Sequence, residues 1–280
     1  MKEKKSKSKI LQKLGLALLL IVALGAAFWA GRISINNPRQ TLPKITAAII
    51  KPEPKIAELK NYEVPILMYH YIRVADPDDR LGLALSVTPN NFDLQMKWLK
   101  DNNYESMKLV ELADPQKIEL GKIIASGKKP VIITFDDGYD NAYTQATPIL
   151  KKHNFTGTFF IIRNFVGKPA YAAQSQIDKM AEDGMEIGSH SLDHKDLAKS
   201  SLEIDHKQIF DSKMGADVFC YPSGRFIPES VALVKEAGYK VAVTTLGGIA
   251  NQDSNLFELP RVRITNTDLE TFAKRVQGLK

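Results

Sequence analysis

Two adjacent carboxylates stand at the end of an apolar stretch of the chain. Residues 131–135 lead directly into Asp136 and Asp137, and Gly138 follows them. Neighbouring side chains of a strand point to opposite faces, but Gly138 breaks the strand and can turn both carboxylates into one site. Two close carboxylates do not both ionise cheaply unless a cation separates their roles. The simpler alternative is a turn with two solvated acids.

A pair of histidines follows another predicted strand, residues 185–189. His190 and His194 stand four residues apart, which predicts that they share one face of a helical turn and can bind one metal ion. A chance cluster at the start of a helix is the alternative. The nearby His206 lies on the polar side of a predicted helix, so we expect it to be a solvated surface residue.

The two groups together predict hydrolytic chemistry. One aspartate and two histidines make a three-ligand site that leaves coordination positions open for water and substrate. Zn²⁺ is the default ion for such nitrogen and oxygen ligands, although other divalent metals would fit. The second aspartate is then free to act as a general base on water, and no serine or cysteine nucleophile is required.

These two groups resemble the first and second motifs of the polysaccharide deacetylases of the NodB-homology type, carbohydrate esterase family 4. The resemblance covers roughly residues 64–265. It implies a deformed (β/α) barrel and a metal-dependent enzyme that removes N-acetyl groups from amino sugars of a cell-surface or cell-wall polysaccharide. It also implies that Asp136 is the catalytic base and that Asp137, His190 and His194 bind the metal.

The third motif of the family departs from its usual form in this chain. Cys220 stands where the family has an arginine that steadies the catalytic base, so another residue must orient Asp136. Arg261 and Arg263 alternate along a predicted strand, and one of them could face the site. Cys220 itself is expected to be a small buried residue and not a nucleophile. Residues 243–248 also lack the aspartate and tryptophan of the fourth motif.

The residues after Cys220 are expected on the substrate side of the site. By resemblance, the backbone N–H of Ser223 would donate to the oxyanion, with Tyr221 and Pro222 beside the substrate. A plain turn is the alternative interpretation of this run. Four tyrosines flank the motifs and could either stack on sugar rings or belong to the core, namely Tyr69, Tyr71, Tyr139 and Tyr221.

The fifth motif of the family, Leu-x-x-His, stands at the front of the domain. Leu67 and His70 form it, whereas no histidine follows His206. This resembles the permuted arrangement of deacetylases that act on poly-N-acetylglucosamine and related polymers. The resemblance implies that His70 is the general acid for the leaving amine and that Leu67 lines the acetyl pocket. The alternative is a structural histidine at a strand end whose hydrogen bonds are made within the protein.

Alternating strands and helices must position these residues. Thr88 and Pro89 predict a helix start, as cap and first helical residue. Repeated strand–helix units imply a parallel sheet or barrel, with the active site at the carboxyl ends of the strands. The predicted strands are 64–69, 131–135, 158–162, 185–188, 218–221 and 241–244, and the further helices are 142–152, 177–182 and 229–237.

The charge distribution weakens the case for nucleic acid as a partner. The chain has a net charge of +6, yet residues 1–13 carry +5, residues 32–60 carry +4 and residues 61–280 carry −3. The basic character thus belongs to the two ends of an apolar segment. A single cysteine excludes a disulfide framework and a cysteine-built zinc site.

The N-terminal segments predict export of the domain. We expect a cytoplasmic basic tail (1–13), a transmembrane signal anchor (14–31), a proline-containing tether (32–62) and a deacetylase domain (63–280). The domain would then be extracellular on a single-pass anchor in the cell membrane. A cleaved signal peptide, which would release the protein as a secreted form, and a core helix are the alternatives for the apolar segment. No obligate protein partner is predicted.

Two other functions fit parts of the sequence. A glycoside hydrolase would use Asp136 and Asp137 as its carboxylate pair, but it would leave the two histidines without a role. A catalytically silent carbohydrate-binding protein of the cell surface is consistent with the missing arginine and the missing fourth motif.

Overall fold

The computed structural model describes Leu59 and residues 61–279. The predicted basic tail and signal anchor, and most of the predicted tether, lie outside these residues. Within the described part of the chain, no helix combines the length and the apolar character needed to cross a membrane.

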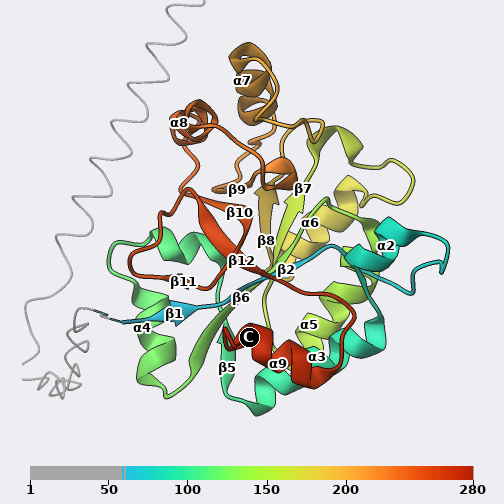
Figure 1. Cartoon of the computed structure of the whole chain (residues 1–280), viewed down its shortest axis with the longest axis vertical. Coiled ribbons are helices and arrows are strands. Elements are labelled where there is room, and N and C mark those ends of the chain that lie inside the picture. Colours follow the sequence, from blue (N-terminus) through green and yellow to red (C-terminus); the bar gives the residue numbers. More distant parts are fainter. Residues whose placement is uncertain (1–58, 60, 280) are drawn as a thin grey trace, which may run out of the picture. The chain divides into compact units, whose positions relative to one another are not determined.

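Seven parallel strands close into a barrel at the centre of the domain (Figure 1). The α/β barrel expected from the sequence is therefore confirmed. A further strand, β5 (Tyr104–Ser106), pairs with the first residues of β6. The barrel strands, in their order around the ring, are β2 (Ile66–Tyr69), β12 (Leu259–Arg263), β10 (Val241–Gly247), β9 (Val218–Cys220), β8 (Glu186–Ser189), β7 (Thr158–Ile161) and β6 (Lys129–Phe135).

The first barrel strand of the chain closes the ring. On one side β2 pairs with the last strand, β12, where Leu67 stands opposite Val262. On the other side it pairs with β6, where Ile66 stands opposite Ile132. The front of the domain thus lies between its last strand and β6, so a functional residue carried by β2 reaches the same edge as those of the later strands.

Eight α-helices surround the strands in the described part of the chain. The predicted helix start is confirmed, because the Thr88 side chain accepts a hydrogen bond from the N–H of Asn91 and Pro89 is the first helical residue. In Figure 1, α3, α5 and α9 lie on one side of the barrel strands, and α7 and α8 lie on the opposite side. The helices are α2 (Arg80–Leu85), α3 (Pro89–Asp101), α4 (Ile118–Ala125), α5 (Thr147–His153), α6 (Gln174–Glu182), α7 (Leu202–Phe210), α8 (Pro228–Glu236) and α9 (Leu269–Val276).

Short elements complete the framework. The helix expected over residues 142–152 begins as a π-helical turn, η2 (Ala142–Ala146), and α5 follows it. Three 3₁₀ turns are η1 (Leu109–Ala113), η3 (Arg163–Phe165) and η4 (Pro222–Gly224). Two small sheets pair β1 (Glu63–Val64) with β11 (Ala250–Asn251), and β3 (Tyr71–Ile72) with β4 (Ser86–Val87).

The barrel strands separate two rows of buried side chains. Leu67, Ile133 and Val262 pack in one cluster with Phe92 and other residues of α3, so they point outward to the helices. The opposite faces form a second cluster that fills the barrel, with Ile66, Ile132, Val218, Val241 and Leu259 among its members. Because side chains alternate along a strand, residues two and four positions further on continue the inward rows toward the carboxyl edge.

A buried carboxylate ties η1 to the strand that leads to the histidine pair. The Glu186 carboxylate accepts hydrogen bonds from the backbone N–H groups of Leu109 (2.8 Å) and Val110 (3.1 Å) and from the Thr158 hydroxyl (2.6 Å). Burial raises the pKa of Glu186, and these three hydrogen bonds oppose the increase.

Glu186→Gln should destabilise the domain by about 1–3 kcal/mol, because the amide NH₂ would face a backbone or hydroxyl donor and leave a buried group unpaired. Urea unfolding followed by circular dichroism measures the loss. The control is Glu119→Gln, which removes an exposed i,i+3 ion pair with Lys122 and should cost less than about 0.5 kcal/mol. Equal unfolding midpoints for the two variants would contradict this role of Glu186.

Candidate functional site

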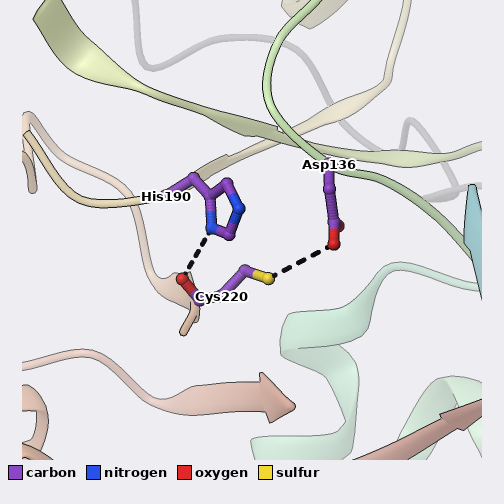
Figure 2. A group of neighbouring side chains, drawn as sticks. All are labelled: Asp136, His190 and Cys220. Carbon is purple, nitrogen blue, oxygen red and sulfur yellow. Dashed lines mark hydrogen bonds between the residues drawn. The ribbon is translucent and has the colours of Figure 1, made fainter. Parts of the chain in front are cut away.

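The carboxyl ends of five barrel strands bring the polar residues of the motifs together. Asp136 follows β6, His190 follows β8, and His70 follows β2. Cys220 ends β9, and Arg261 lies on β12. Figure 2 shows Asp136, His190 and Cys220 pointing toward one another from different segments of the chain.

A buried ion pair holds the first aspartate. Arg261 donates from both terminal nitrogens to the two carboxylate oxygens of Asp136, each at 2.7 Å. The Arg261 side chain is 0% exposed and that of Asp136 is 3% exposed. Burial alone would raise the pKa of Asp136, but the charge and hydrogen bonds of Arg261 outweigh it and hold this pKa well below its usual range. Asp136 is therefore ionised at neutral pH.

Further hydrogen bonds fix the guanidinium in the plane of the carboxylate. Arg261 donates from Nε to the carbonyl oxygen of Thr244 (2.7 Å) and from one terminal nitrogen to the hydroxyl of Thr134 (3.0 Å). The Thr134 hydroxyl in turn donates to the carbonyl of Leu67 (2.8 Å). The other terminal nitrogen lies 3.3 Å from Sγ of Cys220. Arg261 thus occupies the space beside Cys220, where the sequence lacks the expected arginine.

The second aspartate faces both histidines. Oδ1 of Asp137 lies 3.3 Å from Nε2 of His190 and 3.5 Å from Nε2 of His194. Nδ1 of His190 lies 2.8 Å from the carbonyl oxygen of Cys220, which can only accept, so Nδ1 carries a proton. Burial alone would lower the pKa of His190, but its neighbours Cys220, Asp137 and Asp136 outweigh burial and raise this pKa well above its usual range. Nε2 therefore carries a proton toward the Asp137 carboxylate, and a divalent ion would take the place of that proton. One carboxylate and two imidazole nitrogens around one point are a donor set that fits such an ion.

The loop that carries the histidines is not helical, so the predicted helical turn is wrong. Ser191 and His194 have left-handed backbones, with φ of 63° and 57°. The Ser191 hydroxyl accepts a hydrogen bond from the N–H of His194 (3.0 Å), which folds the loop back on itself. Asp137 is also left-handed (φ 74°). Such strained backbone conformations of residues other than glycine cluster at functional sites.

Gly138 permits the turn that aims Asp137 at the histidines. Its φ is +75°, and an added Cβ would lie 3.1–3.3 Å from atoms of Ile161. A side chain at this position would therefore be both strained and crowded. The turn expected from the sequence is confirmed at this residue.

A second group of possible ligands shares one histidine with the first. Asp136, His190 and Cys220 also bring ligand atoms within 4.8 Å of one another. Both oxygens of Asp136 are already engaged by Arg261, however, and burial raises the pKa of the Cys220 thiol, although the Arg261 charge opposes this. A protonated thiol is a poor metal ligand. The donor set therefore favours Asp137, His190 and His194.

His70 completes the group of catalytic candidates. Its Nε2 lies 3.8 Å from Oδ2 of Asp136. Burial lowers the pKa of His70, and the charges of Asp136 and Asp137 oppose this while those of Arg261 and Arg263 add to it. The imidazole is therefore neutral at neutral pH and lies beside the Asp136 carboxylate, outside direct hydrogen-bond distance.

The structure brings only some of the predicted substrate residues to the site. Ser223 lies in η4 directly after β9, is exposed and has a left-handed backbone with φ of 54°. Pro222 is buried beside it. Tyr221 and Leu67 are fully buried and face outward from their strands, among the core clusters. Leu67 contributes its backbone carbonyl to the support of Arg261 and its side chain to the core.

Three tyrosines form a stack beside the site. Tyr71 and Tyr139 stack with ring centroids 3.7 Å apart, and Tyr171 lies 5.1 Å beyond Tyr139. The Arg73 guanidinium covers the other face of Tyr71 at 3.8 Å. Both faces of Tyr71 are therefore occupied, so its edge and hydroxyl, and not a ring face, remain for a ligand. Tyr69 is buried in the core, and His206 is exposed as expected.

Known proteins are similar to this chain in sequence. Residues 124–242 match the family profile described as polysaccharide deacetylase. YxkH of Bacillus subtilis, which is assigned to the polysaccharide deacetylases, is 32% identical over 82% of this chain and 85% of its own length. The poly-beta-1,6-N-acetyl-D-glucosamine N-deacetylase of Staphylococcus epidermidis is 28% identical over 76% of this chain and 82% of its own length.

A solved structure extends the likeness to three dimensions. The deacetylase PplD of Streptococcus pyogenes, solved in complex with acetate, has a TM-score of 0.63 and 31% identity to this chain. The match covers 72% of this chain and 92% of the PplD chain. The chain therefore belongs to the polysaccharide deacetylases of the NodB-homology type, carbohydrate esterase family 4, which are hydrolases that act on N-acetyl groups.

Proposed function

We propose that this protein is a metal-dependent N-deacetylase that removes acetyl groups from amino-sugar units of a cell-surface polysaccharide. One observation carries the proposal. The two adjacent aspartates have different partners, because Arg261 binds Asp136 while His190 and His194 face Asp137. Family membership supplies the reaction class, and this division assigns the roles.

A divalent ion, most simply Zn²⁺, held by Asp137, His190 and His194 would polarise the acetamide carbonyl and make water a better nucleophile. Asp136, kept ionised by Arg261, accepts the proton of the attacking water. The N–H of Ser223 stabilises the negative charge that develops on the carbonyl oxygen. Because a carboxylate held by arginine has a low proton affinity, Asp136 passes the proton to His70, and His70 delivers it to the departing amine.

The relatives narrow the substrate to N-acetylated polymers. The staphylococcal relatives are named for poly-beta-1,6-N-acetyl-D-glucosamine. The position of His70 after the front strand β2 resembles the permuted arrangement of deacetylases that act on this kind of polymer. Peptidoglycan and chitin-like chains present the same acetamide. We therefore assign the substrate class as polysaccharides that contain N-acetylated amino sugars, with the staphylococcal polymer as the leading example.

The geometry argues against the two other functions considered. A catalytically silent protein was suggested by the missing arginine, and Arg261 supplies a guanidinium at the expected place. A glycoside hydrolase needs two carboxylates about 5–9 Å apart across a glycosidic bond. Here one carboxylate is bound in an ion pair and the other faces two histidines, so neither is free for that role.

We also propose that the domain acts outside the cytoplasm. The lysine-rich residues 1–13 and the uncharged residues 14–30 support a signal anchor, with the deacetylase domain on the outer side of the cell membrane. Cleavage of that segment would release the same domain as a secreted enzyme. Protease accessibility of the domain on intact cells tests its location.

Asp136→Asn should abolish acetate release, by about 100-fold or more, while leaving the metal content unchanged. His194→Ala should lower the metal content as well as the activity. Acetate release from poly-N-acetylglucosamine, with and without chelator, and metal per chain by elemental analysis provide the two measurements. The role assignment is wrong if Asp136→Asn deacetylates normally or if chelator leaves the wild-type rate unchanged.

An arginine at position 220, on β9, should be able to replace Arg261 as the partner of Asp136. Arg261→Met should lower kcat by about 100-fold, because Asp136 loses its orienting partner. Cys220→Arg alone should also lower kcat, since Cys220 already touches Arg261. The double variant, Cys220→Arg with Arg261→Met, should recover at least about tenfold over Arg261→Met. A double variant that is no more active than Arg261→Met, at equal Tm, would contradict this account.

A further inference from the structure

A cavity with a cationic lining lies at the ends of β10 and β12. This open cavity of about 400 Å³ is lined by residues that end β10 and β12 and by the C-terminal end of α9. Arg261, Arg263 and Arg275 line it, and none of its lining residues within the described part of the chain is acidic. Because Asp136 neutralises Arg261, the cavity keeps two guanidinium charges.

The two remaining guanidinium groups have no carboxylate within ion-pair distance in the described part of the chain. Arg275 is nevertheless held in place, since it donates to the carbonyl of Arg263 (3.3 Å) and to the hydroxyl of Thr265 (2.9 Å). Arg263 is exposed and Arg275 is partly exposed, so both guanidinium groups are accessible to an anion from solvent. Arginine is the side chain best suited to carboxylate and phosphate groups.

Arg263 relates the cavity to the strand that leads to His70. Arg263 stands opposite Met68 of β2, and His70 follows two residues after Met68. Arg263 lies two residues after Arg261, so both occupy the same face of β12. Consistent with this position, the charge of Arg263 adds to the effect of burial in lowering the pKa of His70. A group bound by Arg263 would therefore lie near the sugar unit whose amine is released.

The cavity has room for a ligand because part of its wall is backbone. Gly247, Gly248 and Gly278 are among its lining residues. A Cβ added to Gly247 would meet no atom within 4 Å, whereas one added to Gly248 or Gly278 would meet Pro260 at 3.2 Å or Ile249 at 2.9 Å. The open side at Gly247, next to accessible guanidinium groups, is what a carboxylate or phosphate on a polymer requires.

We propose that the cavity lined by Arg263 and Arg275 is an anion-binding subsite that holds a carboxylate or phosphate group of the polysaccharide during deacetylation. The inference rests on the proposed function. It adds that the preferred polymer carries acidic substituents near the N-acetylated unit, whereas a neutral polymer would leave the subsite empty.

The test compares two oligomers that differ in a single carboxylate group. One is a neutral oligomer of N-acetylglucosamine, and the other is the same oligomer with one primary alcohol oxidised to a carboxylate. The full-length wild-type protein should show a kcat/KM for acetate release about tenfold or more higher on the oxidised oligomer. Arg263→Gln, and Arg263→Gln combined with Arg275→Gln, should abolish that ratio.

The matched control is Lys274→Gln. Lys274 neighbours Arg275 on α9, is exposed and pairs with Glu270, so its loss removes one charge without touching the cavity. This variant should keep the wild-type ratio. Equal kcat/KM values on the two oligomers for wild type, or a preference that survives in both Arg263 variants, would overturn the subsite. Inorganic phosphate that competes with the oxidised oligomer would extend the ligand class to phosphate.

The same oligomers distinguish a failure of the proposed function from a failure of the subsite. If wild type releases acetate from neither oligomer, the deacetylase proposal fails, and direct calorimetric binding of the two oligomers then decides the subsite. Tighter binding of the oxidised oligomer that disappears in Arg263→Gln would support the subsite, and equal binding would overturn it.

Discussion

The ion pair between Arg261 and Asp136 is the constraint on which the rest of the site depends. Adjacent aspartates would otherwise compete for the same cation and repel each other. Because both oxygens of Asp136 are occupied by the guanidinium, only Asp137 is available to the histidines. A buried charge without a partner costs about 3–5 kcal/mol, so the pair must be formed whenever the domain is folded. The partners of the two carboxylates are thus fixed before substrate arrives.

Closure of the barrel makes this pair possible. Arg261 is carried by the last barrel strand and Asp136 by the strand on the far side of β2. The front strand β2 lies between them and supplies both the Leu67 carbonyl, which supports Arg261 through Thr134, and His70. Segments about 125 residues apart in the chain therefore meet only when the ring is complete. The site therefore requires the closed barrel.

The sequence predicted the elements and the motifs because both depend on local patterns. The strands that lead to Asp136 and His190 and the strand that contains Cys220 were identifiable, and the alternation of Arg261 and Arg263 pointed to a substitute arginine. Three other features depended on tertiary contacts. The histidine loop uses left-handed residues in place of a helical turn, Leu67 faces the helices, and Tyr71 is covered on both faces. Only the packed barrel determines these, since each depends on which neighbours surround a residue.

The location of the bound metal tests the central claim most directly, because two ligand groups share His190. Anomalous X-ray scattering from crystals of the metal-loaded protein would locate the ion. We predict a single ion held by Asp137, His190 and His194, with both oxygens of Asp136 still bound to Arg261. An ion held by Cys220 and Asp136, with Arg261 displaced, would contradict the assignment of the two aspartates.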